Sequence, residues 1–117
     1  MKLSLLNIQN TAQAQAEILR IDSTAAGAAI MKDKAVFKTV KLAGVDCRAA
    51  NILKQTFLSK GGEAAVSRAC ADLSAATSDV IIMATVHQYK QAIPVLKMQP
   101  WKLKEVAQLL EQMLREA

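Results

Sequence analysis

The sequence predicts one α/β domain, a sandwich in which a mixed sheet of about four strands carries helices packed on it. The 117 residues fit the size of a single domain. Short runs rich in β-branched residues alternate with segments that have helical periodicity, which is typical of this fold class. No internal repeat and no linker rich in glycine, proline or serine divides the chain. We therefore expect residues 1–117 to form one domain with the element order β-α-α-β-α-β-β-α-α.

The first predicted elements are a strand and a helix. Residues 2–8, "KLSLLNI", are apolar without a helical period, which predicts a buried strand. Asn10 is a good helix N-cap, and Gln13 follows three residues later, in the register of a capping box. The helix is expected to continue to about Ile21.

A shorter helix and a strand follow. Ser23 or Thr24 can cap a helix over residues 25–35. Residues 35–42, "AVFKTVKL", are rich in β-branched residues, but alternation fails at Lys38. Because lysines discourage further pairing, this segment is expected to be a strand near the edge of the sheet.

The next part of the chain has the clearest end signals. Gly44 is expected to form a turn and Asp46 to cap the helix over residues 47–60. The glycine pair 61–62 follows a helix and precedes a short strand, "EAAV". A phosphate-binding loop instead lies between a strand and the next helix. We therefore expect these glycines to end the helix.

The C-terminal third contains the strongest strand and the best-patterned helix. Residues 67–79 are expected to form a loop. Residues 79–86, "DVIIMATV", are apolar on both faces, which predicts a strand in the centre of the sheet. A helix follows over residues 87–100, and Pro94 should either kink it or split it into two pieces. Residues 102–114 have the periodicity of an amphipathic helix.

Composition argues against several classes of protein. Aromatic residues make up 3% of the chain, too few for a platform that stacks nucleic-acid bases. The two cysteines and single histidine cannot supply a zinc site. A disulfide is geometrically allowed, but two reduced thiols in a cytoplasmic protein are favoured. No signal peptide or membrane span is expected, since the longest apolar run, residues 80–86, is too short. We expect no metal and no cofactor.

The positive charge is localised. The chain carries a formal charge of +5, and the segment 32–60, with seven basic and two acidic residues, accounts for it. Such a face can attract phosphates, acidic proteins or nucleic acid, or can simply be solvated. The candidates for an anion-binding or partner-binding surface are Lys38, Lys41, Lys54 and Arg68.

A second candidate site lies at the end of the strongest strand. Ligands of α/β folds usually bind near the carboxyl ends of strands. The residues there, which predict a pocket, are Thr85, His87, Gln88 and Tyr89. A polar first helical turn is the alternative explanation. No nucleophile with a base and an orienting partner can be assembled from the spacing, so no catalytic residue is assigned.

Three strings carry a family resemblance. "ANILKQTFLSKGGEAAVSR", "SDVIIMATVHQYKQ" and "KMQPWKL" occur in this order within residues 34–114. Together they resemble the extra N-terminal domain of a subset of bacterial dihydropteroate synthases. The enzymes of that family are transferases that join a dihydropterin pyrophosphate to p-aminobenzoate on a TIM barrel.

The resemblance implies an accessory role. A TIM barrel needs about 250 residues, and the pterin and diphosphate loops of the family are absent from this sequence. The resemblance therefore implies a non-catalytic domain of a folate-biosynthesis protein, with the catalytic barrel or another subunit as its partner. The alternative is a module that binds a small anion or a pterin phosphate through the segment 32–60.

Overall fold

The computed structural model describes residues 1–117 and confirms the α/β class. The elements are α1 Thr11–Arg20, α2 Ala25–Met31, η1 Lys32–Lys34, β1 Phe37–Asp46, α3 Cys47–Ser59, β2 Glu63–Val66, η2 Arg68–Cys70, β3 Thr77–Thr85, α4 Val86–Leu96 and α5 Leu103–Leu114. The sheet has three antiparallel strands, so the expected mixed sheet of about four strands is not formed. The chain also begins with helices rather than with a strand.

The three strands are connected as a split β-α-β unit. Their order is β1-β3-β2, and β3 is antiparallel to both neighbours. β1 and β2 therefore run parallel, with α3 as their connection and β3 inserted between them. Val40, Ile82 and Ala64 lie side by side in one row of the sheet. The predictions of an edge position for β1 and a central position for β3 are confirmed.

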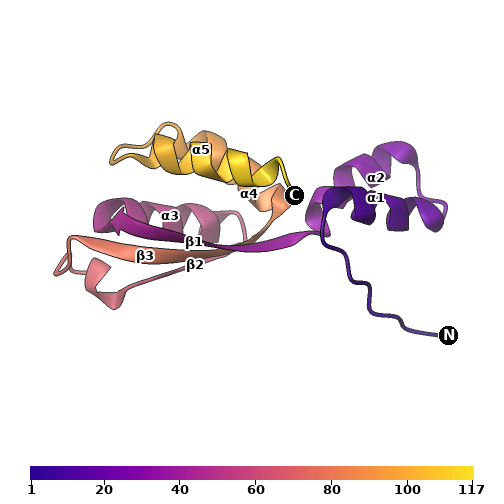
Figure 1. The fold of residues 1–117 in the computed structure, drawn as a ribbon, viewed down its shortest axis with the longest axis horizontal. Coiled ribbons are helices and arrows are strands. Elements are labelled where there is room, and N and C mark those ends of the chain that lie inside the picture. The colour runs from indigo at the N-terminus through magenta and orange to yellow at the C-terminus, as the bar shows by residue number, and fades with distance from the viewer.

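Residues 2–8 do not form the expected strand. Residues 1–9 have no regular secondary structure, and Leu3 and Leu5 are 91% and 97% exposed. A strand needs a neighbour that satisfies its main-chain hydrogen bonds. α1 and α2 lie beyond the end of the strands, and the N-terminal segment runs away from the sheet below them (Figure 1). The apolar pattern was therefore insufficient without an adjacent strand.

Helices cover only one face of the sheet. α3, α4 and α5 share a single core cluster with the inward residues Val80, Ile82 and Ala84 of β3. Phe57 of α3 and Tyr89 of α4 are fully buried in it, with their rings edge to face at 5.3 Å. The alternate residues of β3 face the other side, where no helix packs. β3 is therefore central in the sheet but covered on one face only, although its sequence is apolar on both faces.

The predicted helix ends are largely confirmed. Gly61 has a φ of 86°, and its N–H donates to the Leu58 carbonyl at 3.1 Å. The N–H of Gly62 donates to the Phe57 carbonyl at 2.9 Å, which completes a Schellman motif at the end of α3. α4 continues as one helix through Pro94, so the alternative of two pieces is wrong.

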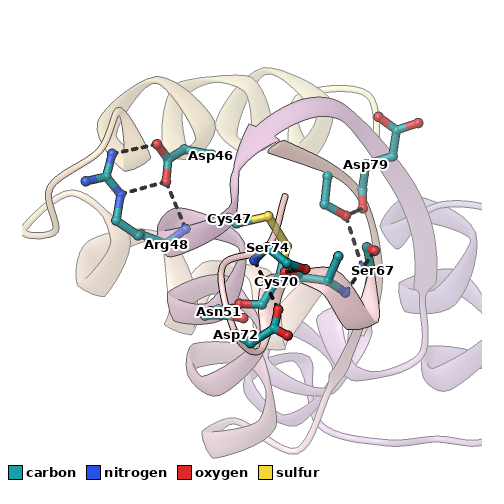
Figure 2. The surroundings of a disulfide bond; sticks show 11 residues. Asp46, Cys47, Arg48, Asn51, Ser67, Cys70, Asp72, Ser74 and Asp79 are labelled. Carbon is teal, nitrogen blue, oxygen red and sulfur yellow. Dashed lines mark hydrogen bonds and ion pairs between the residues drawn. A yellow bond between two sulfur atoms is a disulfide. The ribbon is translucent and has the colours of Figure 1, made fainter. Parts of the chain in front are cut away.

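Cys47 and Cys70 form a disulfide, which contradicts the expected pair of reduced thiols (Figure 2). It joins the first residue of α3 to η2, in the loop before β3, and both cysteines are buried. The Cα atoms are 4.9 Å apart, within the usual range. The side chain of Asn51 supports the same loop by donating to the Cys70 carbonyl at 2.9 Å. The prediction of thiols rested on the rarity of disulfides in the cytoplasm. The sequence does not show that the β2–β3 loop returns to the start of α3, where the two cysteines meet.

The N-terminal helices extend the molecule beyond the sheet. The overall dimensions are 53 × 28 × 22 Å, and the radius of gyration is 16.3 Å. A compact chain of this length would have a radius of about 13 Å. None of the helices is both long enough and apolar enough to cross a membrane.

Candidate functional site

The largest cavity lies between the end of β1 and the start of α5. Its volume is about 670 Å³. It is bounded by the end of β1, the first residues of α3 and the first two turns of α5. The lining residues are Lys41, Leu42, Ala43, Gly44, Val45, Asp46, Arg48, Thr77, Trp101, Lys102, Glu105, Val106 and Leu109. We call it the Arg48–Trp101 cavity.

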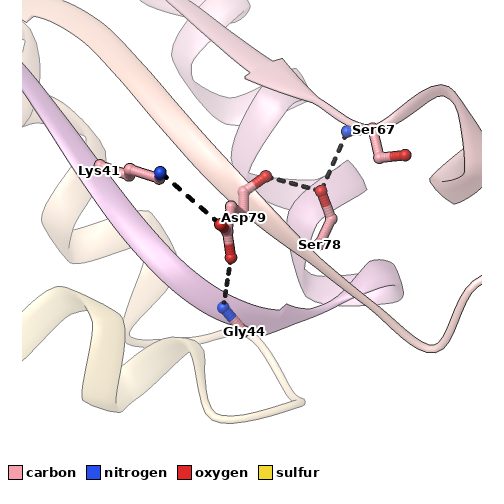
Figure 3. Close-up of polar contacts among 5 residues, drawn as sticks. All are labelled: Lys41, Gly44, Ser67, Ser78 and Asp79. Atoms are coloured by element: carbon pink, nitrogen blue, oxygen red, sulfur yellow. Dashed lines mark hydrogen bonds and ion pairs between the residues drawn. The ribbon is translucent and has the colours of Figure 1, made fainter.

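A β-bulge shapes one wall of this cavity. The register of β1 against β3 shifts between Leu42 and Val45, and Gly44 has a φ of 67°. The carboxylate of Asp79 fastens the bulge by accepting the Gly44 N–H at 3.0 Å (Figure 3). The expected turn at Gly44 is therefore wrong: the strand bends there and continues to Asp46. Bulges commonly redirect the side chains that follow them.

The opposite wall is the start of α5. Trp101 and Lys102 both have left-handed φ values, 56° and 64°. Non-glycine residues adopt this conformation infrequently. It reverses the chain after Pro100 and sets Trp101 at the cavity. Lys102 occupies the N-cap position of α5, and no side chain caps this helix.

Arg48 connects the two walls. Its guanidinium donates to Asp46 through Nε at 3.1 Å and Nη2 at 2.8 Å (Figure 2). The same group lies 4.9 Å from the centre of the Trp101 ring, a cation–π contact. The side-chain hydrogen bonds from Arg48, followed by its main-chain N–H, lower the pKa of Asp46 from 3.8 to about 2. Asp46 therefore carries its negative charge throughout the neutral range.

Of the residues that line this cavity, sequence reasoning singled out Lys41 and missed Arg48 and Trp101. Lys41 has only a long contact with Asp79, 3.8 Å between Nζ and Oδ2 (Figure 3). The sequence signal that could have identified Arg48 is the pattern Asp46-x-Arg48 at the start of a helix, because these two side chains can pair around the first turn. Trp101 could not be placed because its neighbours give no sign of a left-handed pair of residues.

The four predicted basic residues do not form one cluster. Lys38 and Lys41 lie on opposite faces of β1, because they are three positions apart and side chains alternate between the faces of a strand. Lys54 and Arg68 line a pocket of about 440 Å³ between α3 and the end of β2. The ammonium of Lys54 donates to the Ala64 carbonyl at 2.8 Å and to Glu63 at 3.1 Å. Anion binding by these residues stays a prediction.

The four residues at the end of β3 mostly hold α4 in place. Thr85 and Gln88 form a capping box at the start of this helix. Tyr89 is buried, and its hydroxyl lies 2.8 Å from the Lys38 carbonyl oxygen. That burial raises its pKa. His87 is half-buried in the first turn. Ligand binding at these residues also stays a prediction.

The chain is 40% identical over 84 residues to a probable bifunctional folylpolyglutamate synthase/dihydropteroate synthase of Halobacterium salinarum. The aligned part is 72% of this chain but only 10% of the length of that relative. No family model and no solved structure matches the chain. The similarity therefore indicates a relation between this chain and a small part of a folate-pathway protein.

Proposed function

We propose that this chain is a non-catalytic accessory domain of a dihydropteroate synthase-like folate-biosynthesis protein. It docks onto the catalytic domain or onto another subunit and holds that partner in position. The similarity to a small part of a much longer folate enzyme supports this context. The motifs within residues 34–114 support an N-terminal position relative to the catalytic barrel.

The uncovered face of the sheet is the observation that carries the docking proposal. Phe37 is 59% exposed and Ile81 is 38% exposed on this face, and Met83 lies half-buried between them. Lys41 and Glu63 lie around these apolar residues in the adjoining strands. An apolar centre with a charged rim is typical of interfaces between domains.

The side chains at the end of β3 support a structural role. Thr85 and Gln88 bond to each other's main chain, and the hydroxyl of Tyr89 contacts main-chain carbonyls. These polar groups are therefore used in attaching α4 to the sheet. The chemistry of the parent transferase is assigned to its barrel.

A binding experiment with two matched variants tests this proposal. The chain is mixed with the dihydropteroate synthase catalytic domain of the same organism, and association is measured by sedimentation velocity. Ile81→Lys places a charge at the centre of the uncovered face and should weaken association by at least about tenfold. Leu58→Lys is the control, since Leu58 is 41% exposed on α3, on the helical side of the sheet.

Both variants must have the melting temperature of the unmodified chain, so that any change in association is not caused by unfolding. Docking through the uncovered face is supported if Leu58→Lys associates as the unmodified chain does and Ile81→Lys associates more weakly. Absence of any complex contradicts the proposal, as does equal weakening by both variants.

A cytoplasmic location is part of the proposal. The buried Cys47–Cys70 disulfide fits it least well, because disulfides are rare in reducing compartments. Trapping free thiols with an alkylating reagent during cell lysis, followed by mass spectrometry, measures the state of both cysteines. A fully reduced pair in cells would agree with the cytoplasm.

A further inference from the structure

We propose that the Arg48–Trp101 cavity binds a small organic anion that carries a flat ring. The inference concerns the opposite side of the sheet from the docking face, and it does not depend on the proposed function. Its grounds are the size of the cavity, the free donors of Arg48, the exposed indole ring and the uncapped start of α5.

The cavity has the size and lining of a small-molecule site. Ligand pockets commonly have volumes of about 300–1,000 Å³ and apolar walls with a few polar groups. The volume here is about 670 Å³. Leu42, Val45, Val106 and Leu109 provide the apolar wall.

Arg48 is preorganised as an anion receptor. Asp46 engages Nε and Nη2, and the indole ring of Trp101 lies against the same planar group. These two contacts fix the plane of the guanidinium, while its Nη1 group has no acceptor in the structure. A fixed guanidinium with free N–H groups suits a carboxylate or a phosphate.

Trp101 supplies the surface for a ring. Arg48 occupies one region of the indole, and the residue as a whole remains 41% exposed. Aromatic groups pair favourably with such a ring in offset or edge-to-face arrangements. A ligand that joins a ring to an anionic group can therefore use both residues together.

The charged side chains of the cavity balance, and the start of α5 adds positive potential. Arg48 and Lys102 stand against the two carboxylates of Asp46 and Glu105, while the ammonium of Lys41 lies on the other face of the sheet beside Asp79. The uncapped start of α5 adds the positive end of a helix dipole. Glu105 opposes anion binding, because it has no ion-pair partner in the structure and lines the same cavity.

Fluorescence gives a direct readout, since Trp101 is the only tryptophan of the chain. The complete chain is titrated with benzoate and with phenyl phosphate, and the emission of Trp101 is recorded. We expect a saturable change with both compounds. Benzamide, which keeps the ring without the charge, and inorganic phosphate, which lacks the ring, should bind at least about tenfold more weakly.

Three variants locate the site. Arg48→Gln should lower the affinity for benzoate by about tenfold or more. Arg68→Gln is the matched control, because it removes an arginine from the separate Lys54–Arg68 pocket, and it should leave the affinity unchanged. Glu105→Gln should increase the affinity by removing a like charge. This last change keeps the proposal testable even if Arg48→Gln unfolds the protein.

Several results would overturn the proposal. One is the lack of saturable change with either ring-bearing anion, and another is benzamide binding as tightly as benzoate. If Arg68→Gln lowers the affinity for benzoate as much as Arg48→Gln or more, the anion binds in the Lys54–Arg68 pocket instead. An unchanged or lower affinity in Glu105→Gln would contradict the charge argument.

Discussion

The sheet region, residues 37–114, and the N-terminal region, residues 1–36, are held together in different ways. In the sheet region, one cluster of nineteen buried residues joins the strands to α3, α4 and α5. Beside it, the N-terminal region has a cluster of only three buried residues, Ala14 of α1, Val36 just before β1 and Val86 at the start of α4. Burial of apolar surface therefore stabilises the first region far more than the second.

Single polar contacts attach the N-terminal region. The Thr11 N–H donates to the carbonyl of Ala117 at 2.7 Å, and Lys90 pairs with Asp33 at 2.7 Å. Such contacts contribute little individually when they are accessible to water. The difference teaches that the sheet region can specify its own fold, whereas α1 and α2 depend on the ends of that region for their position.

The largest expected effect comes from a cavity in the main core. Phe57 is fully buried beside Tyr89, and Phe57→Ala should reduce the free energy of unfolding by about 3–5 kcal/mol. Val36→Ala, in the small cluster, removes two methyl groups and should cost about 1.5 kcal/mol. Chemical denaturation measures both. Equal losses would show that the N-terminal region is as integral to the core as α3.

The disulfide should give the next effect. Cys47 and Cys70 are 23 residues apart in sequence, and closing a loop of this length stabilises the folded state by about 3 kcal/mol in the chain-entropy description. Oxidised protein should therefore resist urea more than protein kept in a reducing agent. Protein with both cysteines changed to alanine is the control, since the reducing agent should leave its unfolding midpoint unchanged. Identical midpoints for the oxidised and reduced natural chain would contradict a contribution from this bond.

Sequence predicted the elements of the sheet region because their signals are local. The N-cap at Asp46 and the glycine end of α3 depend on a few neighbouring residues, and both were found. The position of β3 in the centre also followed from its apolar length. These features need no knowledge of what packs against them.

The failures all concern contacts between distant parts of the chain. Residues 2–8 have the composition of a strand, but no strand lies near enough to pair with them. The open face of β3 could not be predicted, because the sequence does not state on which side the helices pack. Arg48 and Trp101 are 53 positions apart in the numbering, and they meet only because Trp101 and Lys102 reverse the chain in left-handed conformations.

The smallest expected effect separates the two regions by their sensitivity to acid. The carboxylates whose pKa values are lowered, Asp46, Glu63 and Asp72, all lie in the sheet region. Folding lowers the pKa of Asp46 from 3.8 to about 2, chiefly through the side-chain hydrogen bonds from Arg48. The unfolded chain therefore binds a proton at Asp46 more readily than the folded chain. The stabilisation is complete above about pH 4 and is lost as the pH falls towards 2.

Asp46→Asn should consequently melt with a weaker dependence on pH in this window than the natural chain. The melting temperature, recorded by circular dichroism between about pH 5 and pH 2, measures the difference. Asp22→Asn is the matched control, because the carboxylate of Asp22 in the N-terminal region has no hydrogen-bond or ion-pair partner in the structure, and its curve should follow that of the natural chain. Glu63 and Asp72 keep some acid sensitivity in the Asp46 variant, so the slope should fall without vanishing. If the two variants have the same slope, the pairing of Asp46 with Arg48 does not stabilise the folded state, and the cavity loses one of the contacts that fix its guanidinium.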